Sequence, residues 1–135
     1  KGLTISTFGG NPVSSAASLA TIQVMEEEGL PKNAAVVGEH LRGKLEELKD
    51  KHALIGDVRG MGLMQAMELV TDRKTKEPAK QQIGRFMEET RKRALLVGKG
   101  GLYGNVVRIS PPLNCTKAQV DDAVKVMDEA LTACR

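Results

Sequence analysis

Length and composition are those of one globular domain: the chain has 135 residues, 41% of them hydrophobic and 27% charged, which excludes a disordered chain. The 20 basic and 17 acidic residues are interspersed and leave a net charge of only +3. Aromatic residues make up 2%, so the core must be aliphatic, and a nucleic-acid partner that stacks its bases on aromatic side chains is not expected.

The N-terminal segment is rich in glycine, serine and threonine, and a helix is predicted directly after it. Asn11 is a favourable N-cap and Pro12 a favourable first helical residue. Small residues dominate positions 13–20, which would let this helix approach another backbone closely. The helix should end near positions 26–29, with Pro31 as the stop signal.

A second helix is predicted from about Lys32 to Lys51, because apolar residues recur there at three- and four-residue intervals. Residues 54–70 change to apolar residues interrupted by glycines, which predicts two strands around a tight turn. Residues 71–78 are predicted to form a charged polar loop. The apolar stripe of the second helix consists of Val37, Leu41, Leu45 and Leu48.

The rest of the chain alternates between helix and strand. We predict a helix over 79–93, a short strand over 95–97, a glycine-rich loop over 98–104 and a strand over 106–109. Thr116–Gln119 has the sequence of a capping box, so a last helix should follow. This helix should bury Val120, Val124, Met127 and Leu131. The order of elements predicts an α+β fold in which helices cover one face of a small sheet.

The most informative segment is 107–113, which places Arg108 at the end of a run of β-branched residues. Pro111 and Pro112 follow directly after this run. Proline fixes φ and pushes the residue before it toward extended geometry, so the backbone beyond Arg108 has few conformations. A guanidinium held in this way grips a carboxylate bidentately, which a lysine does less well. The alternative is a strand-end arginine that faces solvent or a structural acid, and this segment alone favours neither.

A second polar segment, Ser6 to Pro12, combines hydroxyl groups and exposed amides beside a helix start. Such an arrangement favours an anion such as a phosphate, through the N–H donors and the helix dipole. The alternative is an ordinary capping turn, which is the commoner use of such residues. Residues 98–101 match the spacing of neither a P-loop nor a dinucleotide-binding loop, so a flexible connector is expected there.

The remaining polar residues indicate no metal or nucleophile site. His40 and His52 are too far apart to share one helical face and are predicted to lie at the surface. The basic run Arg91–Arg93 is expected to mark a helix C-terminus rather than a nucleic-acid patch. Cys115 and Cys134 form no CxxC pair, and no segment is apolar enough to span a membrane. We therefore expect an intracellular chain without a membrane partner, either cytoplasmic or in the mitochondrial matrix.

Three segments form an ordered set: Thr7-Phe8-Gly9-Gly10-Asn11-Pro12, Gly56-Asp57-Val58-Arg59-Gly60-Met61-Gly62-Leu63-Met64 and Val107-Arg108-Ile109-Ser110-Pro111-Pro112. Taken together, and roughly at family spacing, they resemble the C-terminal part of the class III pyridoxal-phosphate aminotransferases. Each motif alone is weak, whereas the ordered set is specific. The resemblance extends over essentially the whole chain, and the loop 96–105 looks most like the alanine–glyoxylate branch of the family.

The resemblance implies the C-terminal small domain of a fold-type I enzyme at residues 13–135, with residues 1–12 belonging to the edge of the large cofactor-binding domain. It implies that Thr7, with Ser6 beside it, binds the phosphate of pyridoxal 5'-phosphate across the interface of a homodimer. It also implies that Arg108 binds the substrate α-carboxylate. The implied substrates are an alanine-like amino acid donor and a 2-oxo acid acceptor such as glyoxylate or pyruvate.

In the family, the lysine that binds the cofactor covalently, the aspartate that pairs with its pyridine nitrogen and the aromatic residue that stacks on its ring lie upstream of the TFGGNP-like segment. The chain begins at Lys1, and none of its lysines matches that position. It is therefore expected to be a fragment that is inactive alone and does not hold pyridoxal phosphate. The alternative is a stand-alone α+β interaction or regulatory domain in which Arg108 and Thr7 are structural.

Overall fold

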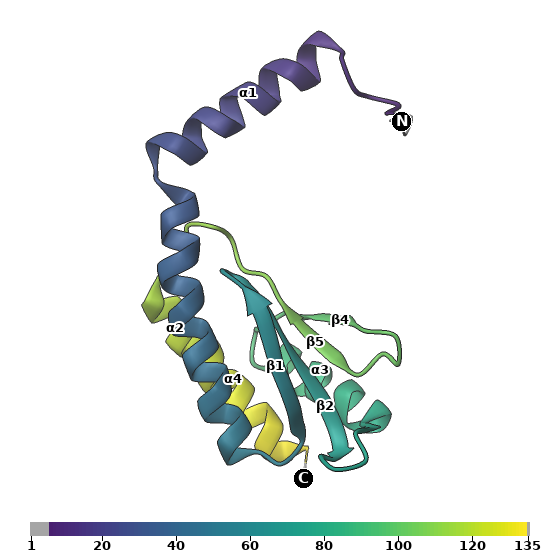
Figure 1. The fold of residues 1–135 in the computed structure, drawn as a ribbon. Coiled ribbons are helices and arrows are strands. Elements are labelled where there is room, and N and C mark those ends of the chain that lie inside the picture. Colours follow the sequence, from purple (N-terminus) through teal and green to yellow (C-terminus); the bar gives the residue numbers. More distant parts are fainter. Residues whose placement is uncertain (1–5, 135) are drawn as a thin grey trace. The chain divides into compact units, whose positions relative to one another are not determined.

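The structure, a computed structural model, describes residues 6–134, and its contacts divide the chain into two units, residues 1–31 and residues 32–135. The assignment of residues 1–12 to a large domain and of 13–135 to a small domain stays a prediction. Along the chain the elements are α1 (Pro12–Glu27), α2 (Leu30–Lys51), β1 (Ile55–Met61), β2 (Met64–Asp72), β3 (Glu77–Pro78), α3 (Lys80–Lys92), β4 (Gly98–Gly100), β5 (Val106–Ile109) and α4 (Lys117–Ala133) (Figure 1).

Helix α1 makes up most of the N-terminal unit and begins where the sequence predicts. Asn11 is its N-cap, and the side-chain oxygen of Asn11 accepts a hydrogen bond from the Ser14 amide at 3.0 Å. Pro12 stands in the first turn, where its missing amide hydrogen has no helical partner to lose. The small residues at 13–20, predicted to approach another backbone closely, are exposed.

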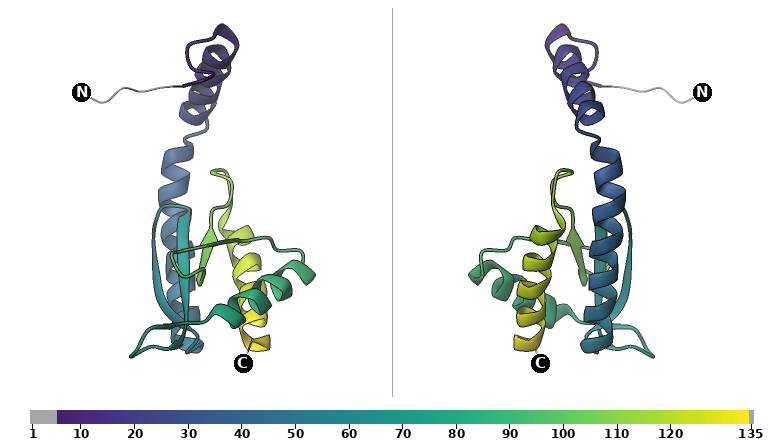
Figure 2. Two further views of the ribbon diagram at one scale, coloured as in Figure 1. Left: turned by 90° about the vertical axis from the view of Figure 1, so that its right-hand side faces the viewer. Right: turned by 90° about the vertical axis from the view of Figure 1, so that its left-hand side faces the viewer.

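The second unit is built on an antiparallel sheet with the strand order β1-β2-β5-β4, and β3 pairs with the end of β2. Strands β1 and β2 form the hairpin predicted for residues 54–70. Helices α2, α3 and α4 share one hydrophobic core with the sheet, and among the described residues of this core Phe86 is the one aromatic side chain. Figure 2 shows α2 and α4 running along the sheet. The predicted α+β fold, with helices on one face of a small sheet, is confirmed.

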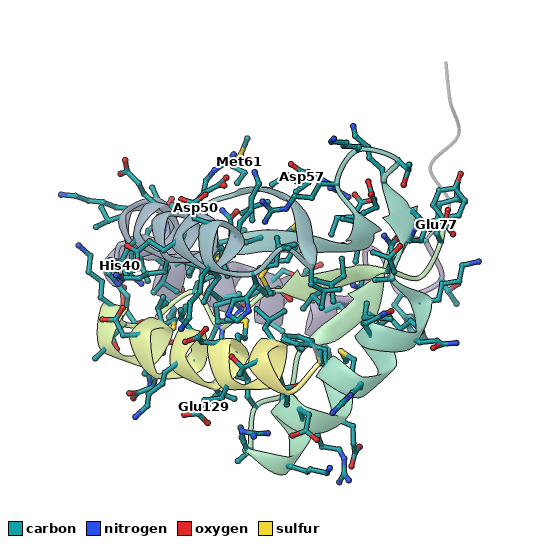
Figure 3. The ribbon with its side chains drawn as sticks, turned by 90° about the horizontal axis from the view of Figure 1, so that it is seen from below. His40, Asp50, Asp57, Met61, Glu77 and Glu129 are labelled. Carbon is teal, nitrogen blue, oxygen red and sulfur yellow. The ribbon has the colours of Figure 1, made fainter. Side chains whose placement is uncertain are left out.

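Alternation along the strands gives the sheet a covered face and an open face. Val58, Met67 and Val107 are at most 3% exposed and belong to the core, on the face that the helices cover. The alternate positions of each strand point the other way, and Figure 3 shows Asp57 and Met61, which are such positions of β1, on the side of the sheet away from α4. The open face is therefore the face that carries Arg108, because Arg108 alternates with the buried Val107.

The glycines of the β1–β2 turn allow a close approach between that turn and α2. A Cβ atom on Gly38 of α2 would lie 2.1 Å from the carbonyl carbon of Gly62. Gly62 itself has a φ of 52°, a left-handed conformation that favours glycine. A Cβ on Gly60 would lie 2.2 Å from the carbonyl oxygen of Met64. The Gly-Met-Gly pattern is thus explained by backbone packing.

Two predicted boundaries differ from the structure at turns. Helix α2 begins at Leu30, so Pro31 stands in its first turn and does not act as a stop between helices. Residues 71–78 are not one loop, because β2 continues to Asp72 and β3 pairs back onto it. The side chain of Asp72 accepts hydrogen bonds from two amides of the turn, those of Lys74 and Thr75, and this closes the hairpin.

The strand predicted over 95–97 is wrong, and so is the flexible connector predicted over 98–101. The strand is β4 at Gly98–Gly100, which pairs with β5, while residues 95–97 have no regular secondary structure and no strand partner. Leu95 and Val97 pack against the core. These residues are apolar because the segment that leads into β4 is partly buried. The position of β4 is set by its pairing with β5, despite the low strand propensity of glycine.

The surface position predicted for His52 is also wrong. Its side chain is 2% exposed, and its Nε2 atom lies 2.5 Å from an oxygen of Asp128 on α4. Lys51 makes an ion pair with the same carboxylate at 2.5 Å. Burial raises the pKa of Asp128, but the hydrogen bonds from Lys51 and His52 outweigh burial and lower it overall. This cluster joins the end of α2 to α4.

Candidate functional site

Arg108 stands on β5, between two residues that anchor the strand in the core. Val107 is fully buried and Ile109 is 8% exposed, whereas the side chain of Arg108 lies exposed on the open face. The strand register places Arg108 in one row with a residue from each of the other three strands of the ladder. This row runs Arg59, Ala66, Arg108 and Gly98.

The two arginines of this row differ in their electrostatic surroundings. Arg59 pairs with Asp57 at 2.6 Å and with Glu68 at 2.7 Å, and its hydrogen bonds to these carboxylates raise its pKa. Arg108 makes no ion pair and no side-chain hydrogen bond with any residue of the described range 6–134. Glu68 is the nearest acid to Arg108 in the register, and it is engaged by Arg59 and by the amide of Asn105. The donors of Arg108 are therefore available.

The chain beyond Arg108 is held by several independent contacts. After Pro111 and Pro112, the amide of Cys115 donates to the carbonyl of Pro112 at 3.0 Å. The side chain of Asn33, on α2, donates to the carbonyls of Leu113 at 2.7 Å and Cys115 at 3.0 Å. Sequence reasoning identified the prolines but missed Asn33, because its two acceptors lie about 80 residues away along the chain.

A cavity of about 450 Å³ adjoins the segment that follows β5. Its walls come from the segment before β4, the Pro-Pro segment and the first turns of α4, and they are mostly apolar. Of the described residues that line it, Arg108 alone carries a charge. Leu41, Val120 and Met127 of its lining belong to the core between the helices and the sheet, whereas the side chain of Arg108 lies on the open face, so the cavity borders the backbone that holds Arg108.

The side chain of Arg108 lies against β4. Gly98 and Gly100 leave open the space that a Cβ atom would take, and the atoms nearest to both positions belong to Arg108. Sequence reasoning treated these glycines as a connector, since glycine spacing alone carries no information about a side chain on the adjacent strand.

Ser6 and Thr7 lie in the turn that leads into α1, in the first unit. The amide of Gly9 donates to the hydroxyl of Ser6 at 2.9 Å, so the hydroxyl hydrogen of Ser6 is left to donate elsewhere. Thr7 is exposed, and its hydroxyl has no hydrogen bond within residues 6–134. The arrangement offers two hydroxyl donors beside a helix start, as the phosphate hypothesis requires, together with the Asn11 cap that the capping hypothesis requires.

Over the described residues there is no group of three His, Cys, Asp or Glu side chains that could hold a metal ion. In the same part of the chain, no helix is both long enough and apolar enough to cross a membrane. The basic residues Arg91 and Lys92 lie in the last turn of α3 and pair with acids one turn earlier, as predicted for a helix end.

Comparisons to known proteins agree with the ordered motifs and with the fold. Residues 2–131 match the family model of the class III aminotransferases, and the chain belongs to that family. An alanine–glyoxylate aminotransferase 2 homologue of Arabidopsis thaliana, described as mitochondrial, is 51% identical over 126 residues. An alanine/serine racemase of Pyrococcus horikoshii is 39% identical over 130 residues.

The fold is shared with solved transaminase structures. An amine transaminase from an uncultivated Pseudomonas species, solved in its PLP-bound form, superposes with a TM-score of 0.87 at 36% identity. The match covers 98% of this chain and 30% of that structure. The two curated relatives are matched over 93% and 96% of this chain but only 26% and 27% of their own lengths. The chain thus spans about a quarter of the relatives it matches.

Proposed function

We propose that this chain is the C-terminal part of a pyridoxal-phosphate-dependent aminotransferase that moves the amino group of an alanine-like donor to a 2-oxo acid such as glyoxylate or pyruvate. The observation that carries the proposal is Arg108: an exposed guanidinium with no acid partner among residues 6–134, fixed between buried strand residues. Arg59, on the same face, is by contrast paired with two acids. The alanine–glyoxylate relative supports this choice of substrates.

Arg108 is the proposed binding group for the substrate α-carboxylate. Its planar fork donates two parallel hydrogen bonds to a carboxylate, which fixes the direction of the substrate as well as its position. The substrate Cα–H bond is thereby oriented for reaction, and the pre-arranged geometry lowers the barrier.

Thr7 and Ser6 are the proposed contacts to the phosphate of the cofactor. They are proposed to bind the cofactor of the other subunit, across a homodimer interface. The residues present fit a phosphate, because both hydroxyls have a hydrogen to donate beside the start of a helix of 16 residues. When bound, pyridoxal phosphate supplies the electron sink for bond cleavage at the substrate Cα. Its covalent lysine is proposed to lie outside these residues, so the chain alone is expected to be inactive.

The proposed function is tested with the full-length enzyme that contains this chain. Incubation with L-alanine and glyoxylate should yield pyruvate and glycine in equal amounts. Because one relative is an alanine/serine racemase, a parallel incubation of L-alanine alone, with no 2-oxo acid added, should test for the formation of D-alanine. Racemisation without transfer would replace the proposed reaction, and the absence of both activities would favour the stand-alone domain. The proposed compartment is intracellular, and the Arabidopsis relative favours the mitochondrion.

Replacing Thr7 by valine in the full-length dimer should weaken retention of the cofactor. Thr7→Val removes one hydroxyl donor and keeps the branched shape, so the expected loss is about 1.5–3 kcal/mol for a hydrogen bond to a charged group. The dissociation constant of pyridoxal phosphate, measured by titration of the apoenzyme, reports the change. Thr21→Val is a suitable control, because the Thr21 hydroxyl bonds within α1 to the carbonyl of Ala17. Equal affinity in Thr7→Val and the unchanged enzyme would assign the segment to helix capping alone.

A further inference from the structure

Strand β4 contains two glycines that its backbone does not require. Gly98 and Gly100 have no positive φ, in contrast to Gly101 and Gly104 in the following loop, with φ values of 83° and 67°. Glycine disfavours a strand, because it has no side chain to pack and loses more entropy on ordering. In strands it often marks a position that another group approaches closely. The reason for these two glycines therefore lies in their neighbours.

The neighbour in both cases is the side chain of Arg108. A Cβ atom on Gly98 would lie 3.3 Å from Nε and 3.5 Å from Nη2 of Arg108. A Cβ atom on Gly100 would lie 3.0 Å from Cδ and 3.2 Å from Nε. The three atoms nearest to each position all belong to Arg108. A methyl group on Gly100 would therefore be tighter than an ordinary contact and would shift the arginine by a few tenths of an ångström, and one on Gly98 would press on it less.

The strand register explains why only these two positions matter. Gly98 is the cross-strand partner of Arg108, and Gly100 lies two residues further along, so both present the same face of β4 to it. Lys99, between them, pairs with Val107 and belongs to the opposite face. On the other side of Arg108, its partner on β2 is the small Ala66. Arg108 thus lies between positions that carry little or no side chain.

We propose that Gly98 and Gly100 are positioning residues for Arg108 and thereby set the preference of the enzyme for substrates with an α-carboxylate. The proposal rests on the proposed carboxylate-binding role of Arg108. No polar group within residues 6–134 orients this guanidinium, so its direction depends on packing. The bare backbone of β4 provides a flat surface along which the arginine stem lies, and it leaves the donors of the guanidinium free for the substrate.

The test uses the full-length holoenzyme with Gly98→Ala, Gly100→Ala and Gly100→Val. A misplacement of 1 Å costs about 10²-fold in rate, so a shift of a few tenths of an ångström should lower kcat/KM for L-alanine by about three- to tenfold in the alanine variants, and further in Gly100→Val. Activity toward an amine without a carboxylate should not change. The melting temperature should stay equal or rise, because alanine and valine lose less backbone entropy than glycine, and valine favours strands. Lys99→Ala is the matched control and should alter neither activity.

Two further variants separate this proposal from the one on which it rests. In an Arg108→Lys background, Gly100→Val should cause no additional loss of preference for L-alanine over the amine, because it acts through the arginine. An additional loss there, or an equal loss for both substrates in Gly100→Val alone, would overturn the positioning role. If Arg108→Lys removes the preference and all three glycine variants retain it, the positioning role of the glycines is wrong and the carboxylate role of Arg108 stands. If Arg108→Lys itself retains the preference, the carboxylate role fails and the glycine proposal fails with it.

Discussion

Replacing Arg108 by lysine in the full-length enzyme is expected to lower kcat/KM for α-amino acids by about 10²-fold. Lysine keeps the positive charge but has no planar fork, so the bidentate contact that orients the carboxylate is lost, at a cost of roughly 3 kcal/mol. An amine without the α-carboxylate makes no such contact and should be affected far less. Steady-state rates for L-alanine and for the amine, measured side by side, give the ratio that checks this expectation.

Arg59→Lys is the control for that experiment, because Arg59 occupies the same row of the open face and already has two acidic partners. Lysine at this position keeps a cation between Asp57 and Glu68, and neither substrate should be affected by more than about twofold, as for a surface ion pair. Equal losses for both substrates in Arg108→Lys, or a lowered melting temperature of that variant, would identify Arg108 as a structural residue.

The largest effect on stability is expected for Gly38→Ala. The added Cβ would meet the backbone of Gly62 at 2.1 Å, and a backbone atom cannot turn aside as a flexible side chain can. The turn between β1 and β2 would have to move away from α2, at an expected cost of about 3 kcal/mol in the free energy of unfolding, as for other overpacked cores. Urea unfolding of the 135-residue chain, followed by circular dichroism, measures this cost.

Gly43→Ala in the same helix is the matched control. No atom lies within 4 Å of a Cβ at this position, so only helix propensity changes, and the variant should be more stable by about 0.5–1 kcal/mol. Opposite signs for the two substitutions would show that Gly38 is required for space rather than for flexibility. A stabilised Gly38→Ala would contradict the close approach of α2 to the turn.

Local rules were sufficient for the starts of α1 and α4 and for the hairpin. Asn11 caps α1, and Thr116 and Gln119 form the capping box of α4, because a cap depends on residues at most three positions apart. The apolar stripe of α2 is buried as its spacing predicts, since one helix face repeats every 3.6 residues. The family was also predictable, because its three motifs lie in order along the chain. The match of residues 2–131 to the family model confirms it.

The sequence by itself thus determined the elements with local signals, the fold class, the family and Arg108 as the residue to examine. Only the tertiary structure decided that the Gly-Lys-Gly segment 98–100 forms β4 and that His52 is buried against Asp128. It also decided that Arg59 rather than Arg108 pairs with the acids of the open face. Each of these depends on which residues face one another across strands or helices that are distant in sequence. Strand register and helix packing set those contacts, and neither propensity nor spacing along one segment contains them.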